Sequence, residues 1–169
     1  MNVDRLRLGL SYGRIYLMDK YSFQNCQKIV VFSSDNTSVF LAKRIGERDY
    51  DDVYSFIGGK METNDADIIE GLRREKAEEV GSEFIIDLYP VYNVMKFFVK
   101  KDGNYMVLPH FYARHVRGGV KLSPEYSGYK WVPISKLQSF EPKIPNIPEV
   151  VGRLLQIVPL IKKEDLVEI

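Results

Sequence analysis

The segment from Gly58 to Gly81 constrains the fold of this chain more than any other, because it combines a glycine-rich loop with a capped helical pattern. Asp67 is a favourable N-cap, and Glu70 stands three residues later, which is the pattern of a reciprocal capping box. Gly81 stands where a left-handed C-cap residue belongs. The pattern therefore predicts a loop followed by a helix over residues 68–80.

One face of this predicted helix is expected to pack against a core. At about 100° per residue, that face consists of Leu72, Ile69, Lys76 and Val80, with Ile68 at its edge. The carboxylates of Glu75, Glu78 and Glu79 fall on the adjoining arc. Glu79 lies at the border of the apolar face, so we expect its carboxylate to be partly desolvated. The stem of Lys76 is expected to cover apolar surface while its ammonium group extends past Glu75 or Glu79.

The three clustered carboxylates need a cationic partner. Acids at i, i+3 and i+4 repel one another, and partial burial makes their ionised forms less favourable. Arg74 can reach Glu78 at i+4, but one guanidinium does not neutralise three acids. Clustered oxygen ligands favour Mg²⁺, with Mn²⁺ as a substitute, and Mg²⁺ often bridges to substrate phosphates. Gly71 lies on the carboxylate side, where it is expected to leave room for a ligand.

The whole segment resembles the signature of the MutT-like Nudix hydrolases. The residues that match in register are Arg74, Glu75, Glu78, Glu79 and Gly81, preceded in the loop by Gly58, Gly59, Lys60 and Glu62. One extra residue lies between Gly59 and Arg74, so the acid of the loop is either Asp65 or absent. Lys76 and Ser82 replace apolar residues of the signature.

The resemblance implies a Mg²⁺-dependent pyrophosphohydrolase that acts on a nucleoside diphosphate linked to another group, including nucleoside triphosphates. It implies that Glu78 and Glu79 bind metal, that Glu75 is a ligand or orients the attacking water, and that the Gly58 carbonyl completes the coordination sphere. It also implies that Arg74 orients the glutamates. A non-catalytic sensor that binds a nucleotide or ADP-ribose is the main alternative, and an isomerase on the same fold is another.

Glu125 is a further candidate, because many Nudix enzymes bring an acid to the metal site from a loop late in the chain. It is flanked by Pro124 and Gly128, which shape a loop able to fold over a cleft. In this interpretation Glu125 supplies a ligand or the general base. The alternative, a solvated glutamate, stays open.

Outside the signature, the pattern predicts a mixed sheet with few helices. Strands are expected over residues 28–32 and 38–44, as a hairpin, and over 53–57, 83–88, 91–100, 105–116 and 129–132. Pro90 is expected to interrupt the strands over 83–88 and 91–100, and Pro109 is expected to mark a bulge or a sheet edge. An edge strand or N-terminal extension is expected over residues 1–27, a short helix from Pro133, and a C-terminal helix over 146–158.

These elements indicate an α/β fold with a sheet between helices. The resemblance implies the Nudix α/β/α sandwich, and residues 129–133 (Tyr-Lys-Trp-Val-Pro) look like a strand found late in that family. His110 and His115 lie five apart on one strand, so they are expected on opposite faces and cannot form a local metal pair. We expect both to be structural or surface residues.

Composition narrows the classes of partner. With 169 residues, 45% of them hydrophobic, the chain is expected to form one domain over residues 1–169. The formal net charge of +1 gives no bulk field for a nucleic acid polymer or an anionic membrane, which leaves a small charged ligand as an open alternative. The resemblance implies that this partner is a small nucleoside diphosphate-linked molecule. Cys26 is the only cysteine, which excludes an internal disulfide and a cysteine-rich zinc site.

No signal peptide or membrane span is apparent, which predicts a cytoplasmic protein. A homodimer stays open.

Overall fold

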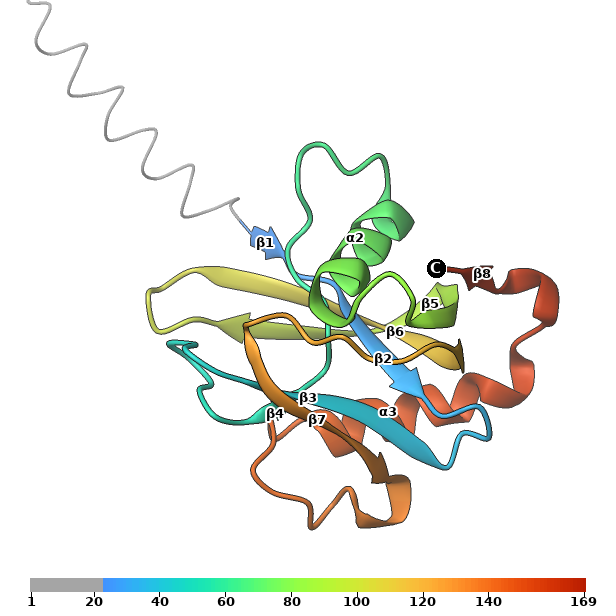
Figure 1. The fold of residues 1–169 in the computed structure, drawn as a ribbon. Helices are drawn as coiled ribbons and strands as arrows, with labels where there is room; N and C mark the ends of the chain where they lie inside the picture. The colour runs from blue at the N-terminus through green and yellow to red at the C-terminus, as the bar shows by residue number, and fades with distance from the viewer. Residues whose placement is uncertain (1–22) are drawn as a thin grey trace, which may run out of the picture.

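A computed structural model describes residues 23–169 of the chain, so most of the element expected over residues 1–27 lies outside the described residues. The elements in chain order are β1 (Phe23–Asn25), β2 (Lys28–Phe32), β3 (Ser38–Arg44), β4 (Tyr54–Ser55), α2 (Ile68–Val80), β5 (Ile85–Val99), β6 (Tyr105–Arg117), β7 (Tyr126–Pro133), the 3₁₀ turn η1 (Ile134–Lys136), α3 (Ile147–Ile157), the 3₁₀ turns η2 (Val158–Leu160) and η3 (Lys163–Asp165), and β8 (Val167–Glu168). Figure 1 shows this arrangement.

The eight described strands form one mixed sheet. Its main path runs β4-β3-β2-β6-β5-β8, while β7 pairs with β3 and β1 with β6. β1 and β2 both run parallel to β6, and the other pairings are antiparallel. β2 and β6 therefore lie at the middle of this path, with the long β5–β6 hairpin extending toward the β8 edge. The predicted hairpin of β2 and β3 is confirmed.

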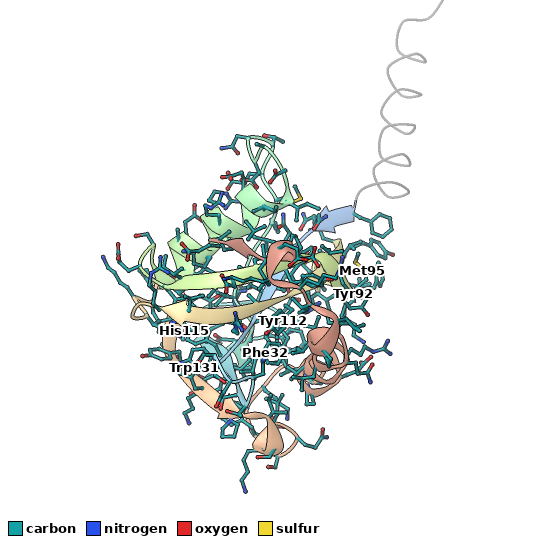
Figure 2. All side chains as sticks on the ribbon, turned by 90° about the vertical axis from the view of Figure 1, so that its right-hand side faces the viewer. Phe32, Tyr92, Met95, Tyr112, His115 and Trp131 are labelled. Atoms are coloured by element: carbon teal, nitrogen blue, oxygen red, sulfur yellow. The ribbon has the colours of Figure 1, made fainter. Side chains whose placement is uncertain are left out.

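The two α-helices lie on opposite faces of the sheet (Figure 1). α2 contributes Leu72 and Val80 to one core cluster, and α3 contributes buried residues such as Leu154 to the other. Figure 2 shows Phe32 and Tyr112 side by side within the second cluster, where their rings stack with centroids 5.0 Å apart. The predicted α/β class, a mixed sheet between helices, is confirmed.

Both proline predictions for the long hairpin are wrong. Pro90 does not divide two strands, because β5 continues through it, and a register shift between Tyr89 and Asn93 takes up the irregularity. Pro109 lies neither on an edge strand nor at a register shift, since it pairs with Met95 in regular register. It lies where β1 ends opposite Val107 and β2 begins opposite His110, so that side of β6 has no paired residue at the proline.

The predicted helix boundaries of α2 are confirmed, but both caps differ in detail from the expectation. The Asp67 carboxylate accepts the backbone N–H of Glu70 at 2.9 Å, as an N-cap should. The reciprocal half of the capping box is not present, because the Glu70 side chain pairs with Arg73 instead. Gly81 has a positive φ of 92°, but its ψ of 153° places it outside the left-handed helical region.

Lys76 shows where tertiary packing departs from the helical wheel. Its side chain is buried, with 2% of the residue exposed, and its Nζ donates to the Ser82 carbonyl at 3.3 Å rather than extending past Glu75 or Glu79. Burial lowers the pKa of this lysine, because the charged form is poorly solvated. The expectation that its ammonium group reaches solvent is therefore wrong.

Lys76→Leu is expected to raise the free energy of unfolding by about 1 kcal/mol, because an apolar side chain replaces a buried charge that has one hydrogen bond. Urea denaturation of the metal-free protein measures this change. Exposed Lys163 offers a matched control, since Lys163→Leu should leave the stability within about 0.5 kcal/mol of wild type. A loss of turnover with unchanged folding would instead show that Lys76 contacts substrate.

Candidate active site

A cavity of about 600 Å³ opens beside the glycine loop and collects most of the predicted site residues. The predicted residues that line it are Gly58, Gly59, Lys60, Glu62, Glu75, Glu79 and Glu125. Further basic residues in its wall are Lys28, Arg44 and Lys100, and its aromatic side chains are Tyr50, Phe56, Phe97 and Phe98. Three separate segments, namely the glycine loop, α2 and the turn before β7, thus bring carboxylates to one cavity, and Lys28 of β2 and Arg44 of β3 add cations.

The two glycines of the loop are required by close contacts. Gly58 has a φ of +109°, and a Cβ on it would lie 2.4 Å from the Gln27 carbonyl oxygen. A Cβ on Gly59 would lie 2.3 Å from Oε2 of Glu75, so the Glu75 carboxylate occupies the space that glycine leaves. The Gly58 carbonyl, predicted as a metal ligand, accepts a hydrogen bond from Nζ of Lys28.

Glu79 is the most buried of the three predicted glutamates, with 5% of the residue exposed. Its Oε2 accepts the backbone N–H of Gly58, and its Oε1 accepts the hydroxyl of Tyr126 at 2.6 Å. Burial, reinforced by the charge of Glu79, raises the pKa of Tyr126, so this hydroxyl stays protonated and donates. The sequence interpretation missed Tyr126, and its only signal there was its position directly after Glu125.

Arg74 joins the glycine loop to α2 through a fork of charged hydrogen bonds. Its Nε and Nη2 donate to the two oxygens of Asp65 at 2.9 and 3.0 Å, and its Nη1 donates to Glu75 at 2.9 Å. Nη2 also donates to the Lys60 carbonyl at 3.0 Å. The hydrogen bonds from Arg74 hold the pKa of Asp65 at about 2. The loop therefore does carry an acid that pairs with Arg74.

Glu75 lies half-buried between like charges. Burial raises its pKa, and the neighbouring carboxylates of Glu79 and Glu78 raise it further, while Arg74 acts in the opposite direction. Glu78 lies apart from the other two: its side chain is 60% exposed, it approaches Arg74 at 3.4 Å, and it does not line the cavity. The structure thus brings Glu75 and Glu79 together in the cavity wall and leaves Glu78 on the solvent-exposed side of α2.

Gly71 does not leave room for a ligand, contrary to expectation. A Cβ at this position would lie 2.9 Å from both Oδ2 of Asp65 and Nε2 of Gln27. The space beside the glycine is therefore filled by side chains of the protein itself. Gly71 allows Asp65 to approach the helix, where it meets Arg74.

Glu125 reaches the cavity because the segment before β7 is attached to the end of α2. The backbone N–H of Ser123 donates to the Glu79 carbonyl at 2.9 Å, which anchors that segment. The Glu125 side chain is 64% exposed and lies 3.6 Å from Nη2 of Arg44. Glu125 thus faces the cavity that Glu75 and Glu79 line, and its carboxylate remains accessible.

The donor chemistry of this site fits a divalent cation with a preference for oxygen. Each oxygen of an ionised carboxylate accepts two hydrogen bonds or ligand bonds, and each Glu79 oxygen receives one donor. Within residues 23–169, no group of three or more His, Cys, Asp or Glu side chains is already arranged around one point. Gly58, Glu75 and Glu79 therefore offer suitable oxygens without a closed coordination shell.

The two histidines lie on opposite faces of the sheet, as predicted. His110 lines the cavity, and its Nδ1 lies 3.0 Å from the Val94 carbonyl. Burial lowers the pKa of His110 to about 4, so the ring is neutral. His115 packs on the other face, with its ring centroid 5.6 Å from that of Trp131 (Figure 2). Among residues 23–169, neither histidine belongs to a group of three or more His, Cys, Asp or Glu side chains arranged around one point.

His110 should make folding sensitive to mild acid. Because its pKa falls from 6.5 to about 4 on folding, the unfolded chain binds the proton more readily between these values. The stabilisation is fully present above pH 6.5 and is lost as the pH falls toward 4. Between pH 7 and 5 we expect wild type to lose about 2 kcal/mol of unfolding free energy through this residue.

His110→Gln should remove that loss, and urea denaturation at the two pH values measures it. His115→Gln is the matched control and should keep the dependence of wild type. The same dependence in the His110 variant would show that another group is responsible.

Comparison with known proteins places the fold. A family model described as NUDIX domain matches residues 25–154. Among solved structures, the chain is similar to the MutT protein of Methanosarcina mazei Go1, with 20% identity, 79% of this chain and 94% of that chain covered, and a TM-score of 0.66. The chain is also similar to a Caenorhabditis elegans Ap4A hydrolase in a binary complex, with 13% identity, 82% of this chain and 99% of that chain covered, and a TM-score of 0.65.

A third similar structure is the NUDIX domain of Shewanella oneidensis NrtR, complexed with ADP ribose, with 16% identity, 80% of this chain and 88% of that chain covered, and a TM-score of 0.62. At these identities the structural similarity shows the fold. Comparison with curated protein sequences gave no match. In the described part of the chain, every helix is too short or too polar to cross a membrane.

Proposed function

This chain belongs to the NUDIX family, and we propose that it is a Mg²⁺-dependent pyrophosphohydrolase that cleaves a nucleoside diphosphate derivative or a nucleoside triphosphate. The observation that carries the proposal is the Glu79 carboxylate, buried yet lining a cavity, with Glu75 and Glu125 in the same wall. Burying acids side by side is unfavourable unless a cation joins them. Such an arrangement is typical of a site built for metal and phosphate.

In this proposal Glu75, Glu78, Glu79 and the Gly58 carbonyl would hold the metal, with Mn²⁺ as a substitute for Mg²⁺. Glu78 would have to turn inward, because its side chain is exposed at the edge of the helix. When bound, the metal would lower the pKa of a coordinated water and offset the negative charge of the leaving phosphate.

The protein's own groups supply the remaining functions. Glu75, with its raised pKa, and Glu125, with its accessible carboxylate, are the two candidates to accept a proton from the attacking water. Arg74 holds Glu75 in place by a hydrogen bond of 2.9 Å. Lys28, Lys60 and Lys100 line the cavity and offset the charge of a diphosphate.

We also propose that residues 1–169 form one domain, that the protein acts in the cytoplasm, and that its partner is a small nucleotide-like molecule rather than a nucleic acid polymer or a membrane. Four aromatic side chains in the cavity wall support a ligand with an aromatic base. A homodimer is compatible with this proposal.

A substrate panel tests the proposed activity. Nucleoside triphosphates, ADP-ribose, dinucleoside polyphosphates, NADH, nucleotide sugars and capped RNA are each incubated with Mg²⁺, and the products are separated to locate the cleaved bond. We expect Mg²⁺-dependent cleavage of a phosphoric anhydride bond in at least one of them. Tight binding of a panel member without turnover, in a single-turnover assay, would instead support a nucleotide-binding sensor.

Glu125→Gln distinguishes the two candidates for the general base. If Glu125 accepts the proton, kcat should fall roughly 10²- to 10⁴-fold while KM changes little, and the acidic limb of the pH profile should shift. Steady-state kinetics across pH measure both effects. Glu164→Gln, an exposed acid outside the cavity wall, is the matched control. An unchanged kcat and pH profile would leave Glu75 as the base.

A further inference from the structure

The buried hydroxyl of Tyr126 forms a hydrogen bond with the carboxylate of Glu79. Tyr126 is the first residue of β7 and is buried, with 5% of the residue exposed. Its hydroxyl donates to Oε1 of Glu79 at 2.6 Å, across 47 residues of sequence. The guanidinium of Arg44 lies 5.7 Å from the centre of the Tyr126 ring. The Tyr126 ring thus packs between the core and the Arg44 guanidinium, and its hydroxyl contacts the Glu79 carboxylate.

This contact completes a clamp on the Glu79 carboxylate. The torsion that turns the carboxylate of a glutamate is broad, so a free Glu79 would sample many orientations. In the structure its two oxygens receive different donors, the Gly58 N–H on one and the Tyr126 hydroxyl on the other. Two donors on two oxygens fix the plane of the carboxylate. The second acceptor position of each oxygen then points in a defined direction.

Tyr126 is itself held from two sides. Arg44 and Tyr126 are paired residues of the antiparallel strands β3 and β7. The backbone N–H of Tyr126 donates at 3.2 Å to the Ser123 carbonyl, and the Ser123 N–H donates to the Glu79 carbonyl. The tyrosine is therefore fixed relative to the sheet and to the end of α2, which allows its hydroxyl to act as a rigid support.

We propose that Tyr126 is a positioning residue that orients the Glu79 carboxylate and thereby sets the affinity of this site for a divalent cation. The inference rests on the proposed function in that Glu79 is taken as a metal ligand. Groups that support a metal ligand by a hydrogen bond typically change metal affinity by roughly 10- to 100-fold when removed. Tyr126 touches neither the metal nor the substrate in this account.

Tyr126→Phe tests the inference by removing one oxygen atom. Mn²⁺ is titrated into the protein without substrate, and free Mn²⁺ is followed by electron paramagnetic resonance. We expect the Kd for Mn²⁺ to rise roughly 10-fold or more. Tyr129→Phe, on the same strand and 44% exposed, is the matched control and should keep the Kd of wild type. A Kd equal to wild type in the Tyr126 variant overturns the inference.

Kinetics separate positioning from general structural damage. If the hydroxyl acts through the metal, Tyr126→Phe should need roughly 10-fold more Mg²⁺ for half-maximal rate, while kcat at saturating Mg²⁺ returns close to wild type. A kcat that stays low at all Mg²⁺ concentrations, with an unchanged Mn²⁺ affinity, would indicate a structural role and overturn the inference. Failure of the proposed function looks different, because wild type would then bind Mn²⁺ but cleave no substrate.

A measurement on wild type keeps the test decisive if the Tyr126 variant folds poorly. Tyrosines are labelled with ¹³C at the ζ carbon, and their resonances are followed during a Mg²⁺ titration. The Tyr126 resonance should shift and saturate with the Kd for Mg²⁺, because its hydroxyl shares Glu79 with the metal. The Tyr129 resonance should stay constant. A Tyr126 resonance that does not move while Mg²⁺ binds contradicts the inference.

Discussion

Glu79→Gln is expected to lower kcat by roughly 10²- to 10³-fold, because the loss of a metal ligand removes several kcal/mol of transition-state stabilisation. Mg²⁺ affinity, measured by calorimetry, should fall in parallel. The fold should persist, since the glutamine oxygen can accept the Gly58 N–H while its amide group donates to the Tyr126 hydroxyl oxygen. The metal-free variant should be as stable as wild type or more so, because a buried charge is gone.

Glu70→Gln is the matched control for this change. It lies on the same helix, but its carboxylate is exposed and pairs with Arg73. Its substitution should leave both kcat and Mg²⁺ affinity close to wild type. Activity of Glu79→Gln near wild type at saturating Mg²⁺ would falsify the ligand role of Glu79.

Arg74→Lys is also expected to lower both activity and stability, although it keeps the positive charge. The guanidinium donates to both oxygens of Asp65, to Glu75 and to the Lys60 carbonyl, and a single ammonium cannot reproduce this planar fork. We expect kcat to fall roughly 10- to 100-fold, because Glu75 loses its support. The midpoint of thermal unfolding should fall by roughly 5 °C as the glycine loop loosens from α2.

Arg73→Lys provides the control at the adjacent position. Arg73 contacts Glu70 on the exposed side of the helix, so the same substitution should change neither kcat nor the thermal midpoint. Differential scanning fluorimetry and steady-state kinetics measure both variants. Equal behaviour of the two lysine variants would show that charge alone, and not the fork geometry of Arg74, matters at this site.

Local patterns determined much of this protein. The limits of α2 follow from Asp67 and Gly81, because a cap and a helix-terminating glycine act within a few residues of themselves. The helix α3 was equally readable, since its burial repeats at the helical period, and β2 and β3 were readable as short continuous apolar runs that are buried on both faces. The border position of Glu79, read from the helical wheel, also predicted its burial.

Interactions between distant segments could not be read in this way. Lys76 turns inward to the Ser82 carbonyl, and the space beside Gly71 is filled by Asp65 and Gln27. Both outcomes depend on how the loop folds back on α2, which the spacing of residues along one helix does not describe. Pro90 was misjudged for a related reason, because a register shift against β6 absorbs a proline that would otherwise end the strand.

The sequence by itself determined the elements and the kinds of chemical group in the site, because capping, periodicity and residue type are local properties. The tertiary structure alone decided which groups meet. It placed Glu75 and Glu79 in a cavity wall with Glu125, left Glu78 at the surface, and brought the Tyr126 hydroxyl within 2.6 Å of Glu79. The physical reason is that such contacts depend on the pairing of β3 with β7 and on the attachment of the segment before β7 to α2.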